Sequence, residues 1–180
     1  MNEKSTFWKS SATSGVILGI ILIIYSVLLY ILELSLNKSM GYGTYLFIIA
    51  GLIWFTLSYR NNNLGGSISY GQALGYGTVM IVIAALISSI YNYIFISYID
   101  PSMIDKMIAM GEEELLKQGM SDEQIEMAQS IQKKIMSPGL MNIFGFIGMV
   151  IVGFIINLIT SAIVKKEGDP YKAAMQEVED

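Results

Sequence analysis

Four long stretches of this 180-residue chain carry no charged side chain, and they constrain its fold more than any other feature. They are Ser10–Leu32, Ser39–Tyr59, Asn61–Ile99 and Ile135–Val164. A helix needs about 20 consecutive, mostly apolar residues to cross the hydrocarbon core of a bilayer. Each stretch is long enough for one crossing. The sequence therefore predicts an all-α integral membrane protein, a four-helix bundle with four transmembrane spans.

The composition supports this fold class and excludes several kinds of chemistry. Hydrophobic residues make up 53% of the chain and charged residues 14%, against about 25% charged in soluble domains. Cysteine and histidine are both absent, so thiolate chemistry, a Ser-His-Asp triad and a typical zinc site are excluded. No acidic cluster indicates another metal, and no basic tract indicates nucleic-acid binding. We expect no catalytic residue, no metal, no cofactor and no nucleic-acid partner.

A single membrane domain is expected over residues 1–180. We place its spans at about 14–34, 42–59, 70–99 and 140–164, followed by a charged cytoplasmic tail at 165–180. The third span is longer than one bilayer thickness, so it must tilt or extend beyond the membrane.

The segment 100–138 is polar and is predicted to form an extramembrane amphipathic helical hairpin between the third and fourth spans. Asp100 followed by Pro101 is typical of a helix start. Gly119 fits the turn, and Ser121 with Gln124 has the spacing of a capping box at the start of a second helix. Alternatively, the third helix simply continues past the bilayer with a kink at Pro101.

Positive charges next to the spans indicate the orientation. Four crossings put both termini on one side, together with Lys9, Arg60, Lys165 and Lys166, whereas only Lys38 lies clearly against a span on the other side. Because lysine and arginine near span ends favour the cytoplasm, we expect both termini to be cytoplasmic and the hairpin extracytoplasmic.

Aromatic residues gather near the expected span ends, where amphipathic rings favour the headgroup level. The inner interface is expected to hold Trp8, Trp54, Tyr59, Tyr70 and Tyr76, and the outer interface Tyr30, Tyr42, Tyr45, Tyr91, Tyr93 and Tyr98.

Polar residues inside the spans are the candidates for a functional role. Asn157 lies deep in the fourth span with Thr160 one turn later, and Asn92 follows Ser88 in the third. Buried amides cross-link helices by about 1–2 kcal/mol or less, which favours a helix-packing role. The alternative is a polar path through a small oligomeric transporter or channel component.

Three further features have a structural and a functional interpretation. Glu33 borders a span and is expected to be an interfacial carboxylate in water. Gly15 and Gly19 have the spacing that lets helices approach closely, either inside the bundle or between copies. The methionine-rich hairpin could pack on itself with a solvated acidic face. Alternatively, it could dock onto an extracytoplasmic protein or the membrane surface, although its acids disfavour anionic lipid.

Several motifs resemble a known bacterial membrane family. They are the run from Gly66 to Gly77 (GSISYGQALGYG), the corner Tyr98-Ile99-Asp100-Pro101, the Ser137-Pro138 entry to the fourth span and the Lys165-Lys166 exit. Together they resemble the family called domain of unknown function 4199, over nearly the whole chain.

The resemblance implies a small four-helix inner-membrane protein of Gram-negative bacteria. The family has no established activity, so the resemblance assigns no catalytic role. It marks a set of family-pattern positions of unknown role: Ser69, Tyr70, Gly71, Gln72, Asp100 and Pro101.

We therefore expect an integral membrane protein without enzymatic activity that has a structural, accessory or interaction role in a bacterial inner membrane. Its expected partners are the lipid bilayer and, through 100–138, a second copy or an extracytoplasmic protein. A small transporter or channel component is the alternative function.

Overall fold

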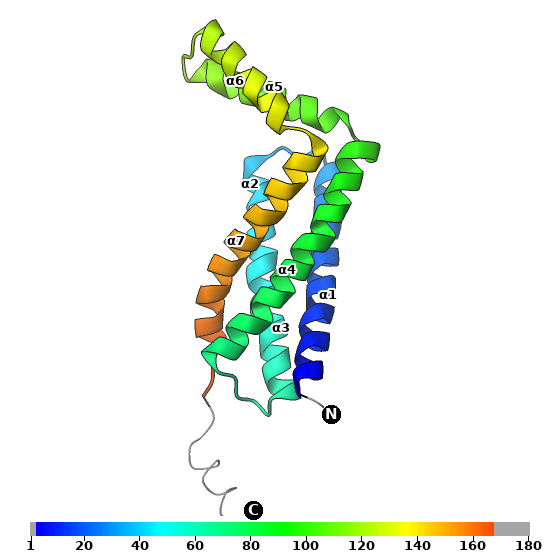
Figure 1. Ribbon diagram of the computed structural model, residues 1–180, viewed down its shortest axis with the longest axis vertical. Coiled ribbons are helices and arrows are strands. Elements are labelled where there is room, and N and C mark those ends of the chain that lie inside the picture. Colours follow the sequence, from blue (N-terminus) through cyan, green and yellow to red (C-terminus); the bar gives the residue numbers. More distant parts are fainter. Residues whose placement is uncertain (1–2, 168–180) are drawn as a thin grey trace, which may run out of the picture. The chain divides into compact units, whose positions relative to one another are not determined.

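Helices make up nearly all of the structure, a computed structural model that describes residues 3–167 (Figure 1). They are α1 (Glu3–Ile31), α2 (Lys38–Gly41), α3 (Gly43–Asn63), α4 (Tyr70–Ile94), the π-helical turn η1 (Phe95–Ile99), α5 (Ser102–Lys117), α6 (Asp122–Ile135) and α7 (Pro138–Val164). Four segments are long and apolar enough to cross a membrane: Ser5–Ile31, Lys38–Asn63, Tyr70–Ile99 and Pro138–Val164. The predicted all-α class with four membrane-length helices is confirmed. Most of the tail expected at 165–180 lies outside the described residues.

Two helices are longer than the predicted spans. Helix α1 begins at Glu3 instead of near residue 14, and hydroxyl groups ahead of the expected span are bonded within the helix. Ser11 Oγ donates to the Phe7 carbonyl at 2.8 Å, and Thr13 Oγ1 donates to the Lys9 carbonyl at 2.8 Å. Helix α3 likewise continues to Asn63, four residues beyond the expected end of its span at 59.

The chain divides into two compact units, and each is described by itself. The bundle unit comprises Met1–Ala85 and Met149–Asp180, so it holds α1, α2, α3, most of α4 and the second half of α7. The hairpin unit, Leu86–Gly148, holds the end of α4, η1, α5, α6 and the first turns of α7.

The bundle unit has an apolar core shared by α1, α3 and α4. Its buried residues are Leu18, Leu22, Ile48, Leu52, Met80, Ile81 and Ala84. Small residues bring the helices close: a Cβ built on Gly51 of α3 would lie 2.8 Å from Leu18 Cδ1 of α1, and one built on Gly153 of α7 would lie 2.7 Å from Ile81 Cγ2 of α4. Close backbone approach through small residues is how helices pack when lipid supplies no hydrophobic drive between them.

One end of the bundle unit is closed by an aromatic cluster. The Tyr59 and Tyr76 rings stack with their centroids 4.4 Å apart, and Phe7 meets both rings edge-on. Tyr59 and Tyr76 are only 5% and 1% exposed. The two rings expected near the inner interface thus pack on each other between helices, at the end of the bundle unit.

The same end ties together segments that are far apart in the sequence. Ile68 and Lys166 form an antiparallel bridge, with N···O distances of 2.8 and 3.0 Å. Arg60 Nη1 donates to the Val164 carbonyl at 2.9 Å, which satisfies one of the free carbonyls at the end of α7. The end of α3, the start of α4 and the end of α7 therefore lie together.

In the hairpin unit, α4 does not simply continue past its span. It ends in η1, whose last bond runs from the Asp100 amide to the Phe95 carbonyl at 2.9 Å, and Asp100 leaves the helical region (φ −136°, ψ 79°). The predicted turn at Gly119 (φ 75°) and the capping box of Ser121 and Gln124 are both present. Helices α5 and α6 thus form the expected hairpin (Figure 1).

The end of α1 has an unusual residue in a position that favours glycine. Glu33 has φ 58°, its amide donates to the Tyr30 carbonyl, and the Leu34 amide donates to the Leu29 carbonyl. These two bonds form a Schellman motif, in which the residue with positive φ is usually glycine.

Replacing Glu33 with glycine should stabilise the protein by about 1 kcal/mol, since a residue with a Cβ pays that order of cost in the left-handed region. The change also removes an acid from the negative end of the helix dipole. Unfolding in mixed micelles titrated with dodecyl sulfate would measure the effect, with Glu33→Ala as the control that keeps the Cβ. A Glu33→Gly variant no more stable than Glu33→Ala would contradict the assignment.

Candidate functional site

Asn157 joins α7 to α4 in the bundle unit. Its side chain is 1% exposed, and Nδ2 donates to the Leu74 carbonyl at 2.8 Å and to Thr78 Oγ1 at 3.3 Å. Ser161 Oγ donates to Asn157 Oδ1 at 3.0 Å, so both ends of the amide are used. Thr160 is 4% exposed and donates to the Asn157 carbonyl at 3.3 Å, within its own helix. The geometry is that of a polar cross-link between two helices.

Gly77 makes room for this cross-link. A Cβ built on Gly77 would lie 2.6 Å from Asn157 Cγ and 2.7 Å from Nδ2. Real Cβ atoms do not approach other atoms so closely, so Asn157 can occupy this place only opposite a glycine. The sequence offered the asparagine as a candidate, but the dependence on Gly77 required the structure.

Tyr76 is a second buried polar centre, which the sequence analysis missed. Its hydroxyl is hydrogen-bonded to Ser14 Oγ at 2.8 Å and to Ser10 Oγ at 3.1 Å, which lie one turn apart on α1. The available signal was that pair of serines, spaced by four residues in an otherwise apolar helix. Tyr76 therefore ties α4 to α1, as Asn157 ties α7 to α4.

The other two polar candidates lie in the hairpin unit. Asn92 is half-buried on α4, and within the described part of the chain its amide has no hydrogen-bond partner. Ser88 Oγ is buried and also has none among those residues. The residue that does bond across helices here is Asn142, which is 7% exposed and accepts from Ser89 Oγ at 3.2 Å.

Three of the family-pattern positions build the start of α4. Ser69 and Gln72 form a reciprocal capping box, in which the Ser69 amide donates to Gln72 Oε1 at 3.0 Å and the Gln72 amide donates to Ser69 Oγ at 3.2 Å. Tyr70 Oη donates to the Leu158 carbonyl of α7 at 3.3 Å. Gly71 has open space where a Cβ would be. A structural role at the start of α4 accounts for Ser69, Tyr70 and Gln72.

Asp100 and Pro101 form a charged corner at the start of α5. Asp100 accepts hydrogen bonds from Ser102 Oγ and, at 3.1 Å, from Lys106 Nζ. Pro101 has helical dihedral angles (φ −61°, ψ −23°) just before the helix begins at Ser102. The hydrogen bond from Ser102, followed by that from Lys106, lowers the pKa of Asp100 below its ordinary value, although partial burial opposes this shift.

Acid should loosen this corner. Because the pKa of Asp100 is lowered in the folded state, its carboxylate stabilises the corner fully above the ordinary aspartate pKa of about 4. That contribution is lost as the pH falls through the lowered value. Hydrogen exchange of the first amides of α5, corrected for intrinsic rates, should show protection at pH 7 that falls at pH 3, and Asp100→Asn should be unprotected at both. Equal protection of the wild type at both pH values would contradict this assignment.

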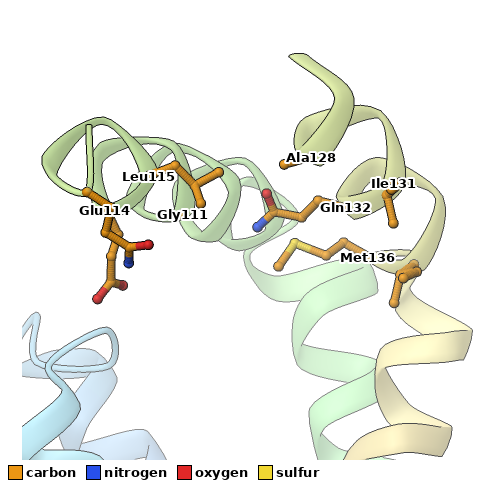
Figure 2. A pocket seen from close by; sticks show the side chains of 9 residues that line it. Gly111, Glu114, Leu115, Ala128, Ile131, Gln132 and Met136 are labelled. Atoms are coloured by element: carbon orange, nitrogen blue, oxygen red, sulfur yellow. The ribbon is translucent and has the colours of Figure 1, made fainter. Parts of the chain in front are cut away.

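An apolar groove runs between α5 and α6 of the hairpin. Its volume is about 590 Å³. It is lined by Gly111, Glu114, Leu115, Gln118, Ala128, Ile131, Gln132, Ile135 and Met136. Figure 2 shows Gln132 of α6, and Met136 just after this helix, on the side that faces Gly111 and Leu115 of α5. The helices approach closely at Gly111, where an added Cβ would lie 2.7 Å from Gln132 Nε2.

Metal ligands do not gather at any of these places. Among residues 3–167, no group of three or more acidic, histidine or cysteine side chains is arranged to hold a metal ion. The described site chemistry consists of hydrogen bonds between helices, one charged corner and an apolar groove.

Four membrane-length apolar helices, of which α1, α4 and α7 are joined by side-chain hydrogen bonds in the bundle unit, define a multi-pass α-helical membrane protein. The chain belongs to the family described as protein of unknown function (DUF4199), whose family model matches residues 13–166. This match confirms the family resemblance noted in the sequence. No curated protein and no solved structure matches the chain.

Proposed function

We propose that this protein is a non-enzymatic accessory protein of a bacterial inner membrane, and that the α5–α6 hairpin is its contact surface. The observation that carries the proposal is a contrast between the two units. Polar side chains of the bundle unit are used in hydrogen bonds between helices, and the hairpin exposes apolar side chains. Asn157 and Tyr76 are used in bonds between helices, whereas the hairpin presents an apolar groove and several exposed methionine and isoleucine side chains.

The alternative of a transporter or channel component has less support. A polar path would need Asn157 beside water, but its amide is buried and both of its ends are bonded to protein groups. Breaking these bonds to bind a solute would leave the Leu74 carbonyl, the Thr78 hydroxyl and the Ser161 hydroxyl to be re-satisfied in an apolar interior. A fixed cross-link between α7 and α4 leaves none of these polar groups unsatisfied, so it is the role that the geometry of Asn157 favours.

The proposed orientation places both termini in the cytoplasm. Arg60, Lys165 and Lys166 are brought to the same end of the bundle unit by the Arg60–Val164 bond and the Ile68–Lys166 bridge. This concentration of positive charge at one end supports a cytoplasmic location for it.

Labelling with a membrane-impermeant maleimide tests the orientation, and the chain has no native cysteine to interfere. Met120→Cys in the hairpin turn should react in intact spheroplasts, whereas Asn62→Cys at the end of α3 should react only after lysis. Met120 is preferable to Gly119, whose positive φ disfavours a side chain. The reverse pattern would overturn the orientation.

Photo-crosslinking in the native cell tests the contact role. A photoreactive residue at Ile131, which is 53% exposed, should give a lipid or protein adduct that mass spectrometry identifies. The same residue at Glu126 of α6 should give none above background. No difference between the two positions would refute the proposal that the hairpin is a contact surface.

A further inference from the structure

Helix α6 has an apolar stripe that the rest of the hairpin leaves about half exposed. Met127, Ile131 and Ile135 follow one another at intervals of four residues, so they share one face of the helix. Their exposed fractions are 64%, 53% and 47%. A stripe of this kind in a 14-residue helix of otherwise polar character requires a partner or an apolar environment.

The stripe extends beyond the face of α6 that packs on α5, and Ile131 and Ile135 also line the groove between the two helices. Ile125 of α6 is only 6% exposed, and Gln132 meets Gly111 of α5. By the helical repeat, Asp122 and Glu126 lie on the far side of α6 from Ile131. The apolar arc of α6 is therefore wider than α5 covers. Asp122 and Glu126 lie opposite the stripe, whereas Glu123 lies in line with it, one turn before Met127.

The base of the hairpin lies at the membrane boundary. Helix α7 begins at Pro138, three residues after Ile135, and the first turns of that span expose Ile143, Phe144 and Ile147 by 55%, 59% and 46%. These side chains face lipid when the span is in a membrane. The α6 stripe is therefore followed, a few residues later in the chain, by the lipid-facing side chains at the start of α7.

Aromatic residues mark the same boundary where the chain enters the hairpin, at the end of α4 and in η1. Tyr98, in the π-helical turn before α5, is 76% exposed, and Tyr93 one turn earlier in α4 is 45% exposed. Exposed tyrosines at a span end are typical of the headgroup level. Both ends of the hairpin are therefore anchored at the membrane surface, which limits how far α6 can lie from it.

We infer that α6 lies in the interface of its own membrane, with Met127, Ile131 and Ile135 inserted among the lipid chains and Asp122 and Glu126 in water. This inference rests on the proposed function and names the partner of that contact surface as the lipid bilayer. An amphipathic helix in this position buries its apolar face about 5–10 Å into the headgroup and acyl boundary. The groove beside Ile131 and Ile135 then opens onto lipid.

Depth-dependent quenching tests the inference on the full chain. Met127→Cys and Ile131→Cys are labelled with an environment-sensitive fluorophore in nanodiscs of phosphatidylethanolamine and phosphatidylglycerol. Ser130→Cys, one residue away on the same helix and exposed, is the matched control. Quenching by lipids that carry a shallow nitroxide should be at least about threefold stronger at 127 and 131 than at 130, as expected for a helix lying in the interface. Quenching by aqueous iodide should show the reverse order.

Two other results would overturn the inference. Iodide quenching at 127 and 131 equal to that at 130 would place the stripe in water. Protection from iodide without quenching by nitroxide lipid would mean that protein covers the stripe, either a second copy or a partner. In that case the contact role from the crosslinking experiment survives and only the lipid assignment fails.

A second measurement does not depend on a probe. Ile131→Glu places a charge in the stripe at a position that is half exposed, so the hairpin should still fold. It should increase trypsin cleavage after Lys133 and Lys134 in nanodiscs by about tenfold, because α6 no longer stays in the interface. Ser130→Glu should leave cleavage unchanged. Equal cleavage in the two variants would contradict the inference.

Discussion

Alanine at position 15 should lower the free energy of unfolding by about 3 kcal/mol, near the upper end for overpacking a tight interior. A Cβ at this position of α1 would lie 2.7 Å from the Met80 carbonyl oxygen and 2.8 Å from Ile83 Cβ, both on α4. The first obstacle is backbone, so no rotamer change can relieve the contact. The two helices would have to separate, which also loosens the core around Leu18.

Gly71→Ala is the matched control for this prediction. It makes the same chemical change in a helix of the same unit, but a Cβ there has open space. It should be neutral or stabilising by up to about 1 kcal/mol, from reduced freedom of the unfolded chain. Dodecyl sulfate titration of both variants in mixed micelles measures the difference. A Gly15→Ala variant as stable as Gly71→Ala would show that α1 and α4 do not approach as closely as described.

Alanine at position 77 should cost about 2 kcal/mol, for a different reason. The obstacle is the Asn157 side chain, which can move, but only by giving up its bonds to the Leu74 carbonyl and to Ser161. The loss therefore combines a steric contact with an unsatisfied buried amide.

A double-mutant cycle isolates this coupling. Asn157→Ala alone should cost about 1–2 kcal/mol from the lost cross-link. Once Asn157 is gone, Gly77→Ala should cost little, so the two changes together should cost less than their sum by at least about 1 kcal/mol. Additive effects in the same unfolding titration would contradict the view that Gly77 exists to seat Asn157.

The sequence was enough to predict the helices and turns, but not which side of each helix is buried against other helices. Uncharged stretches predicted four membrane-length helices, and Gly119 with Ser121 predicted the hairpin turn, because bilayer thickness and helix capping act locally. The faces could not be predicted in the same way. The burial of Tyr59 and Tyr76 between helices could not be predicted, because lipid and protein interior are equally apolar. The sequence therefore carries no pattern that distinguishes a lipid-facing side chain from a buried one.

The candidate polar residues show the same limit. Asn157 was identified because an amide is costly in an apolar span. Asn142 and the Ser14–Tyr76 bond were missed, although they make equivalent contacts. Each depends on a partner in a distant helix, so the signal exists only once the helices are packed. Ser69 was interpreted from the sequence as a helix cap, and the role of Gln72 could have been found as well, since its spacing from Ser69 is that of a capping box.

The pairing of Ile68 with Lys166 has a consequence for assembly. Proteins emerge from the ribosome beginning at the N-terminus, so the turn ahead of the third span is made long before its partner strand exists. The Arg60 guanidinium likewise waits for the Val164 carbonyl. These two contacts can form only after the last span has been inserted. In an incomplete chain, the turn between α3 and α4 would therefore lack the partners that it has in the complete protein.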